Sequence, residues 1–323
     1  MLQLETYDNR WFVIVNPVAG HGHGLTDYPQ IAKLLRDNEI VCDAVFTEYR
    51  YHATELTVEA ANRGYRNIIV VGGDGTLTEV VNGLFIQQVV APNEIRLALI
   101  AVGTGNDWVP TFGTPSHYAE AIRAIREGYT FLQDVGAVTY TESKFRQTRY
   151  MANVAGLGFD AYVISIFNHW KAKGHKGKSL YLASILRAYF SYKSSGMRIE
   201  CDGVEVHNNL LFSLAVGICK YNGGGVQQLP NAVANDGLLD LTLIRPVHWW
   251  HIIFRLRRLF NGSIYSIGHV THAQAKHVRI TSSPPVRIES DGELMGETPV
   301  DIEVVPHAIR VVVTKEFLER HSS

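Results

Sequence analysis

The 323-residue sequence lacks the features that mark secreted, membrane-spanning and disulfide-stapled proteins. It has only three cysteines, Cys42, Cys201 and Cys219, which are far apart and show no CxxC spacing, so neither a disulfide framework nor a zinc site is expected. The N-terminus has no basic segment followed by an apolar one, and no stretch approaches the ~18 uncharged apolar residues that cross a bilayer. We therefore expect a cytoplasmic protein without a membrane span.

The sequence also lacks a dominant charge. It has 30 lysines and arginines against 31 aspartates and glutamates, which gives a formal net charge of −1. Because no overall field would attract nucleic acid, no nucleic-acid partner is expected, and contact with a membrane would need a local basic patch. The length favours two domains, and a hydrophobic fraction of 46% allows each of them a core.

The first part of the chain, from residue 11 to about 134, alternates short apolar runs with helical patterns. Such alternation predicts βα units around a parallel sheet whose strands are buried on both faces. Glycines cluster after three of the expected strands, near Gly20, Gly72 and Gly103. Ligands of open parallel sheets bind outside the carboxyl ends of the strands. We predict that residues 1–134 form a Rossmann-like α/β domain with three glycine loops at one edge.

The rest of the chain is rich in β patterns with turn signals, interrupted by helical stretches near 159–172 and 178–192. This pattern predicts an antiparallel β-sandwich or barrel over residues 135–305. The last apolar run and the tail, about 306–323, could return to either domain.

One glycine-rich stretch, GGDGT at 72–76, follows an apolar run that reads as a buried strand. The glycines let backbone amides approach a ligand, Thr76 can cap the following helix, and a helix N-terminus attracts phosphate. Asp74 would repel phosphate unless a divalent cation lay between them, which suggests a metal-bound nucleotide. An Asp-Gly turn with a capping threonine explains the same residues without a ligand. The stretch alone does not decide between the two.

Several motifs occur in a specific order along nearly the whole chain. They are NPVAG at 16–20, a strand-ending Thr47, GGDGTLTEVVNGL at 72–84, GTGND at 103–107, DVG at 134–136, NDGLLDL at 235–241 and DGE at 291–293. Together they resemble the diacylglycerol kinase catalytic family, particularly its bacterial soluble lipid kinases. The resemblance implies a nucleotide-binding domain similar to that of NAD kinases, a C-terminal β-sandwich, and an active site between them that uses ATP and Mg²⁺.

The resemblance also assigns roles to residues. It implies that ATP is surrounded by Asn16, Pro17, Val18, Ala19, Gly20, Thr47, Gly73, Asp74, Gly75, Thr76, Leu77, Thr78, Glu79 and Thr104. Asp74 would lie at the magnesium-bearing phosphates, with Asp134 in the same network. Phosphorylation of an alcohol needs a group that accepts the hydroxyl proton, and Glu293 matches the family's proton acceptor. Without the resemblance, the DGE segment reads as a hairpin turn.

A structural magnesium ion is implied at Asp236, together with the backbone carbonyls of Val233 and Leu238. A loop Asp-Gly before a strand explains the same aspartate without an ion. Two features depart from the family pattern, Thr78 in place of an asparagine and WVPTFGTP after GTGND, and they bear on the shape of the acceptor site.

A lipid acceptor would require peripheral contact with a membrane. Segments 249–262 and 171–193 interleave aromatic, aliphatic and basic residues, as interfacial helices do, although a helix that faces the core fits equally well. We also expect a homo-oligomer such as a dimer, although no residue pattern predicts it.

The leading hypothesis is an ATP- and Mg²⁺-dependent kinase for a lipid hydroxyl, most simply one that converts diacylglycerol to phosphatidic acid. The alternatives are another acceptor (a sphingoid base, another glycerolipid or a non-lipid alcohol) and a catalytically weak module that senses nucleotide or lipid. NAD kinase is a weaker rival, since the chain has no GTPNGSTAY-like segment to hold a dinucleotide.

Overall fold

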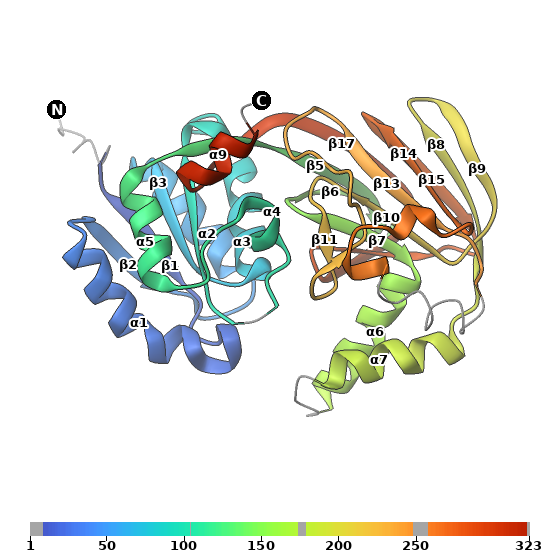
Figure 1. Ribbon diagram of the computed structural model, residues 1–323, viewed down its shortest axis with the longest axis horizontal. Coiled ribbons are helices and arrows are strands. Elements are labelled where there is room, and N and C mark those ends of the chain that lie inside the picture. The colour runs from blue at the N-terminus through green and yellow to red at the C-terminus, as the bar shows by residue number, and fades with distance from the viewer. Residues whose placement is uncertain (1–8, 104, 174–178, 248–257, 322–323) are drawn as a thin grey trace. The chain divides into compact units, whose positions relative to one another are not determined.

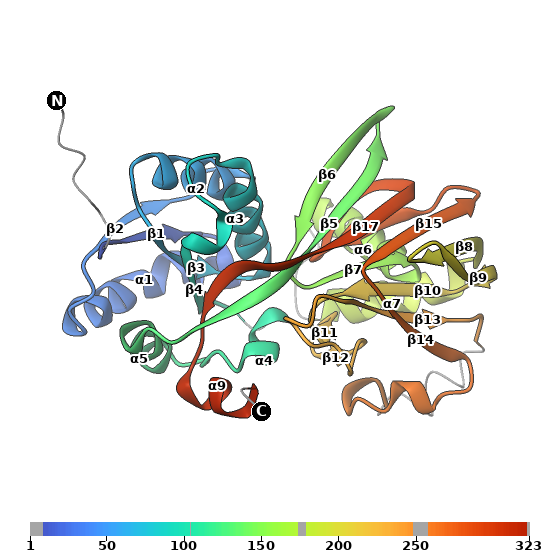
Figure 2. The ribbon, with the colours of Figure 1, turned by 90° about the horizontal axis from the view of Figure 1, so that it is seen from above.

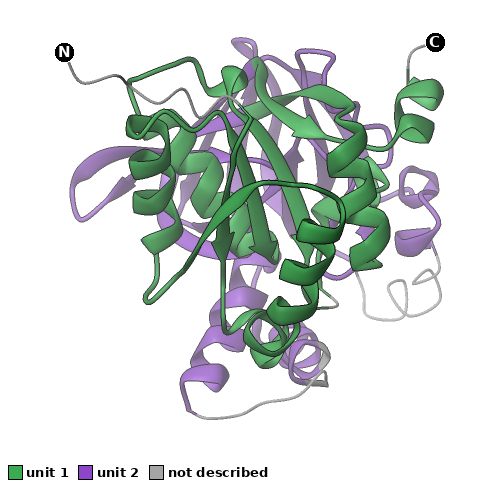
Figure 3. Cartoon of the chain, turned by 90° about the vertical axis from the view of Figure 1, so that its left-hand side faces the viewer, with its two compact units in different colours: residues 1–135, 306–323 green, residues 136–305 purple. Residues whose placement is uncertain are grey.

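The computed structural model describes residues 9–103, 105–173, 179–247 and 258–321. The chain forms two compact units, the first made of residues 1–135 and 306–323 and the second of residues 136–305 (Figure 3). Two long strands, β5 (Thr130–Glu142) and β17 (Glu293–Val312), pass from one unit into the other.

The first unit is built on a parallel sheet. Its strands are β1 (Trp11–Val15), β2 (Cys42–Phe46), β3 (Asn67–Gly72), β4 (Arg96–Ala101) and the end of β17, in the order β17-β4-β3-β1-β2. Every residue of β1 and β3 is buried, as continuous apolar runs of β-branched residues predict for strands covered on both faces. The pairing of Arg310 with Arg96 shows that the last apolar run returns to the first unit, beside β4.

Helices cover both faces of this sheet. They are α1 (Ala19–Asp37), α2 (His52–Asn62), α3 (Asp74–Ile86), the short α4 (Trp108–Phe112), α5 (Tyr118–Glu127) and α9 (Lys315–His321). Figure 2 shows α1 and α5 on one side of the strands and α2 and α3 on the other. Alternate strand residues such as Val13 and Ile69 pack against Ile31 and Leu35 of α1 and Ile122 of α5. The carboxyl ends of the strands and the loops after them thus lie at one edge of a rigid core.

The second unit is antiparallel. Besides parts of β5 and β17 it contains β6 (Phe145–Met151), β7 (Val154–Gly158), β8 (Ser195–Cys201), β9 (Val204–Leu211), β10 (Ser213–Gly217), β13 (Leu239–Ile244), β14 (Val270–Ala275), β15 (His277–Ser283) and β16 (Arg287–Ser290), with a small hairpin of β11 (Tyr221–Asn222) and β12 (Val226–Gln227). Its strands follow the order β14-β13-β10-β7-β16-β17, and β17 also pairs with β15, which continues to β8 and β9.

Two helices, α6 (Phe159–Ala172) and α7 (Ser179–Ser191), lie side by side beneath the strands of this unit (Figure 1). α6 packs on β7, β10 and β16, and α7 packs on α6. The prediction of a Rossmann-like parallel α/β domain followed by an antiparallel β-sandwich is confirmed. No helix among the residues described is both long and apolar enough to cross a membrane.

Candidate active site

Three glycine-containing loops meet at the carboxyl edge of the parallel sheet. Gly20, in the non-helical kink at the start of α1, and Gly103, after β4, have φ angles of +58° and +99°, which favour glycine. A Cβ atom on Gly20 would lie 3.0 Å from the backbone nitrogen of Gly103, so a side chain at either position would push the loops apart. Glycine at both positions therefore allows the first and third loops to pack backbone against backbone.

The first loop is also tied to the second by a side-chain hydrogen bond. Asn16, which follows β1, donates through Nδ2 to Thr76 Oγ1 at 2.8 Å, and its Oδ1 accepts the Val18 amide at 3.1 Å. Thr76 is buried, and a Cβ on Gly72 would lie 2.8 Å from its hydroxyl oxygen. The family motif residues at 16 and 76 therefore fix the shape of the loop edge.

Pro17 and Val18 form the turn into α1, which begins at Ala19, and Val18 is 76% exposed. Gly73 is the N-cap residue of α3, and Gly75, in its first turn, has open space around its Cα. These predicted contacts therefore lie on the surface of the same loop edge.

Asp74 is the first residue of α3, and its carboxylate joins the second loop to the third. Its Oδ2 accepts the Asp107 amide at 2.6 Å, and its Oδ1 accepts the Trp108 amide at 3.4 Å. These amides belong to the start of α4, so the carboxylate caps that helix. Trp108 begins the WVPTFGTP stretch that departs from the family pattern. Its indole is buried and donates to Gln133 Oε1 at 3.0 Å, so this stretch is anchored in the core.

Two residues of the predicted ATP segment turn their side chains elsewhere. Leu77 is 1% exposed and packs in the core. The Glu79 carboxylate accepts the amides of Tyr51 at 3.0 Å and Ala53 at 3.2 Å, at the start of α2. These two side chains stabilise the core and a helix N-terminus, and the expectation that the whole segment surrounds ATP stays a prediction.

The predicted threonines have different positions. Thr47 follows β2, and its amide donates to the Val15 carbonyl at 2.8 Å, beside the end of β1. Thr78 is half-buried in α3, and its carbonyl accepts the Asn82 side chain at 2.8 Å. Thr104 lies outside the described residues.

Asp134 is fully buried on β5, and its Oδ1 accepts the His307 amide at 2.6 Å. His307 has a φ of +49°, so this bond holds a strained backbone position in β17. Because side chains alternate along a strand, Asp134 faces the side of β5 opposite to Gln133. The structure thus gives Asp134 a role in fixing β17 beside β5, whatever else it binds.

In the second unit, Glu293 follows a two-residue turn between β16 and β17. Ser290 pairs with Glu293 across this turn, which consists of Asp291 and Gly292. The Glu293 Oε2 lies 3.2 Å from Arg149 Nη1 on β6, and the two side chains are 20% and 32% exposed. The carboxylate is thus held in one orientation, reaches the surface, and carries a cationic partner.

Two neighbouring carboxyl groups, the buried Glu289 and the half-buried Asp160, lie near this turn. Glu289 is 2% exposed, and burial, reinforced by the negative charge of Asp160, raises its pKa to about 8. Burial also raises the pKa of Asp160, whose Oδ2 accepts the Ser213 hydroxyl and the Gln228 amide at 2.8 Å each. Sequence reasoning missed both groups. No local pattern points to them, since the contact of Gly156 with Glu289, where a Cβ would lie 2.6 Å from Oε1, joins distant parts of the chain.

The proposed structural ion site lies in the loop before β13. Asp236 Oδ1 accepts the Leu238 amide at 3.0 Å, Gly237 has a φ of +74°, and Val233 is 45% exposed. Carboxylate and carbonyl oxygens are the donors that Mg²⁺ prefers, so this loop and Asp74 are both chemically suited to the ion. Among the described side chains, no group of three or more His, Cys, Asp or Glu residues could hold a metal by itself.

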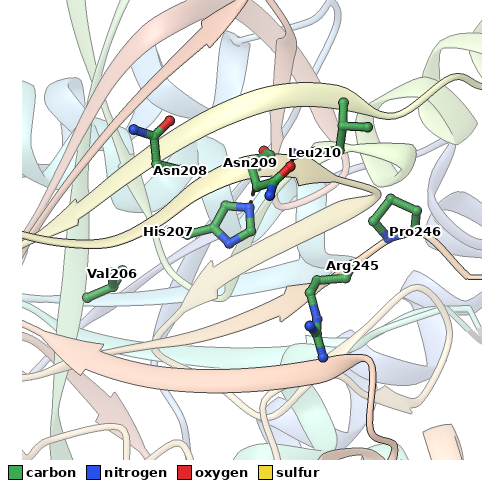
Figure 4. Close-up of a pocket in the computed structure, with 7 residues that line it drawn as sticks. All are labelled: Val206, His207, Asn208, Asn209, Leu210, Arg245 and Pro246. Carbon is green, nitrogen blue, oxygen red and sulfur yellow. Dashed lines mark hydrogen bonds between the residues drawn. The ribbon is translucent and has the colours of Figure 1, made fainter.

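A trough of about 540 Å³ lies between the edge strand β9 and residues Arg245 and Pro246 (Figure 4). Its polar lining includes His207, whose Nε2 lies 3.2 Å from the Asn209 carbonyl. It contains none of the residues that the family resemblance singles out, so it is separate from the candidate site.

Two family models match the chain. The "Diacylglycerol kinase catalytic domain" matches residues 10–138, and the "YegS C-terminal NAD kinase beta sandwich-like domain" matches residues 153–313. A diacylglycerol kinase of Mycobacterium tuberculosis is 27% identical to this chain, and the match covers 93% of each protein. A diacylglycerol kinase of Bacillus subtilis is also 27% identical, and that match covers 95% of this chain and 97% of the relative. The crystal structure of a candidate diacylglycerol kinase from Bacillus anthracis superimposes with a TM-score of 0.75 at 27% identity, covering 97% of this chain and all of that one.

The two models follow one another along the chain in the order that the fold shows. The protein belongs to the diacylglycerol kinase family of bacterial lipid kinases, which shares its β-sandwich with NAD kinases. It is a lipid kinase.

Proposed function

We propose that this kinase transfers the γ-phosphoryl group of ATP to the hydroxyl of diacylglycerol, giving phosphatidic acid and ADP. The bond from the γ-phosphorus to the bridging oxygen of ADP breaks, a bond to the acceptor oxygen forms, and the hydroxyl proton passes to the Glu293 carboxylate. The observation that carries the proposal is this carboxylate, partly exposed and 3.2 Å from Arg149 on a fixed turn. Relatives named diacylglycerol kinase, which match the chain almost throughout, support the choice of acceptor.

We place the ATP phosphates at the three glycine loops of the first unit. The N-terminus of α3 and the glycine amides suit an anion, and the hydrogen bond from Asn16 to Thr76 keeps two of the loops together. Asp74 would hold Mg²⁺, which when bound would neutralise charge on the phosphates. We keep Asp134 as a candidate for the same network and Asp236 for a structural ion.

We also propose that α7 brings the enzyme to the surface where its substrate lies. Its inner face carries the buried Ala188, and the ring of Tyr189 contacts that of Phe212. Its outer face carries Leu186 and Phe190, which are 56% and 76% exposed. Arg187 on the helix and Lys193 just after it are also exposed, and this mixture of apolar and basic side chains suits an anionic bilayer surface. Most of the other candidate segment, 249–262, lies outside the described residues, since the structure does not describe 249–257.

A labelling assay tests the proposed reaction. The purified chain, ATP labelled in the γ-phosphate, Mg²⁺ and mixed micelles of diacylglycerol should yield labelled phosphatidic acid. Glu293→Gln should lower turnover at least about 100-fold, as expected for loss of a proton acceptor, and leave the Kd for ATP within about twofold. Glu297→Gln, an exposed position on the same strand, is the matched control and should behave as wild type.

The acceptor panel should also contain a sphingoid base, a monoacylglycerol, glycerol and NAD. Stronger labelling of one of these would replace diacylglycerol as the substrate. If the wild-type chain binds ATP but labels no acceptor, a nucleotide-sensing module becomes the better description. If Glu293→Gln retains more than a tenth of wild-type turnover, Glu293 is not the proton acceptor.

A further inference from the structure

The turn that presents Glu293 has a demanding backbone. Asp291 and Gly292 both have positive φ angles, +50° and +82°. Gly292 adopts such a conformation readily, whereas Asp291 does so at a cost, because its Cβ approaches its own backbone. Something must therefore hold Asp291 in place.

The Asp291 carboxylate is held by three backbone amides of one segment. Its Oδ2 accepts the Ala152 amide at 2.9 Å, and its Oδ1 accepts the amides of Asn153 and Val154 at 3.1 Å each. The Asp291 amide in turn donates to the Val154 carbonyl at 2.9 Å. Amide bonds to a carboxylate are stronger than neutral ones, so four hydrogen bonds lock the turn to the chain between β6 and β7.

This segment also positions the partner of Glu293. Arg149 lies on β6, three residues before Ala152, so the amides that hold the turn continue the strand that carries the guanidinium. The other residue of the turn is fixed from below, because the Gly292 amide donates to Glu289 Oε2 at 3.0 Å. The ion pair between Arg149 and Glu293 thus depends on a common anchor.

We propose that Asp291 is a positioning residue for catalysis, which acts through Glu293 by anchoring the turn between β16 and β17 to the β6–β7 connection. The inference rests on the proposed role of Glu293 as proton acceptor. Without the three amide bonds, the strained backbone of Asp291 relaxes and the Glu293 carboxylate moves away from Arg149. A displacement of about 1 Å at a reacting group lowers turnover by about 100-fold.

The chain contains a matched control for this inference. Asp202 and Gly203 form the two-residue turn between β8 and β9, with φ angles of +50° and +81°. The Asp202 carboxylate also accepts backbone amides, those of His277 at 2.9 Å and Lys276 at 3.1 Å. Its flanking residues, Cys201 and Val204, carry no acid. A purely structural effect of such an aspartate should therefore appear equally at either turn.

The test compares Asp291→Asn with Asp202→Asn in the full-length chain, with thermal stability, kcat and the KM for ATP measured for each. Asparagine has almost the same volume as aspartate, but its NH₂ group replaces one carboxylate oxygen. It therefore cannot accept the hydrogen bond that this oxygen accepted from a backbone amide. Asp291→Asn should lower kcat by about 10- to 100-fold with the KM for ATP within about twofold, following the expected displacement. Asp202→Asn should lose a comparable amount of thermal stability and keep kcat within about twofold of wild type.

A double variant separates an effect through Glu293 from one on the unit as a whole. If Asp291 acts only through Glu293, adding Asp291→Asn to Glu293→Gln should reduce the residual rate by no more than about twofold. A full multiplicative loss in the double variant, or equal kcat values for Asp291→Asn and Asp202→Asn, would overturn the inference.

The outcome for Glu293 is read separately. An active Glu293→Gln enzyme rejects the proposed proton acceptor, and the positioning role falls with it. An inactive Glu293→Gln enzyme beside a fully active Asp291→Asn enzyme rejects the positioning role alone. Asp291→Ser, which keeps a short acceptor, serves as the second variant. If Asp291→Asn and Asp291→Ser both fail to fold while Asp202→Asn folds, the role of Asp291 is structural and the inference is rejected.

Discussion

The buried carboxyl group of Glu289 makes a sharp prediction about stability. Burial and the neighbouring Asp160 raise its pKa from the ordinary 4.5 to about 8, so the folded chain keeps a proton that the unfolded chain releases. The folded state is therefore favoured by this group below pH 4.5, and the advantage is lost as pH rises to about 8. At ~1.4 kcal/mol for each tenfold change in the protonation equilibrium, the pH-dependent loss is about 4 kcal/mol by pH 8 and about 1 kcal/mol at pH 5.

Glu289→Gln is the perturbation that isolates this effect. Glutamine has nearly the shape of the protonated acid, never ionises, and can accept the Gly292 amide through its own carbonyl. The variant should be more stable than wild type by about 1 kcal/mol at pH 5 and by about 4 kcal/mol at pH 8 in the free energy of unfolding. Urea unfolding of the full chain between pH 5 and 8, followed by circular dichroism, measures both values.

Asp160→Asn provides the check on the cause. Because the Asp160 charge contributes to the raised pKa, its removal should reduce the pH dependence of wild-type stability without abolishing it. A stability difference between Glu289→Gln and wild type that stays constant from pH 5 to 8 would refute the reasoning, since it would mean that Glu289 is ionised in the folded chain throughout this range.

Two further predictions concern the loop edge and the outer face of α7. Asn16→Ala removes the hydrogen bond between the first two loops and should raise the Kd for ATP about fivefold, or about 1 kcal/mol, whereas Asn38→Ala at the end of α1 should leave it unchanged in a direct binding titration. The double variant Leu186→Glu/Phe190→Glu should weaken co-sedimentation with phosphatidylglycerol-containing vesicles by more than about tenfold. The control Val204→Glu, at a similarly exposed position on β9, should bind the vesicles as wild type does. Equal vesicle binding by the double variant and the control would rule out α7 as the membrane face.

The layout of both halves could be read from the sequence because it depends on local patterns. Continuous apolar runs such as those of β1 and β3 suit only strands covered on both faces, and they are fully buried. The helix expected at 159–172 has these bounds in the structure. Residues 149–158 (RYMANVAGLG) have a β-rich pattern, but the chain leaves the sheet at 152–153, between β6 and β7. The amides there bond to Asp291, which is 138 residues from Asn153 in the sequence, and no local pattern encodes that contact.

The candidate site divides in the same way. Motif order alone led to the prediction of Asn16, Asp74 and Glu293 as site residues, because these residue types at these spacings are typical of the family. The assignment of Glu79 to the nucleotide could not be checked locally, because its carboxylate bonds to amides 26 and 28 residues earlier in the chain.

The sequence by itself determined which residues can donate amides, carry charge and enter strands, because these properties belong to single residues and their near neighbours. Only the tertiary structure decided which carboxyl groups are buried, which amides they bond to and which side chain Glu293 faces. Burial and partnership depend on strands that meet from distant parts of the chain. The raised pKa of Glu289 and the orientation of Glu293 both result from these long-range contacts between strands.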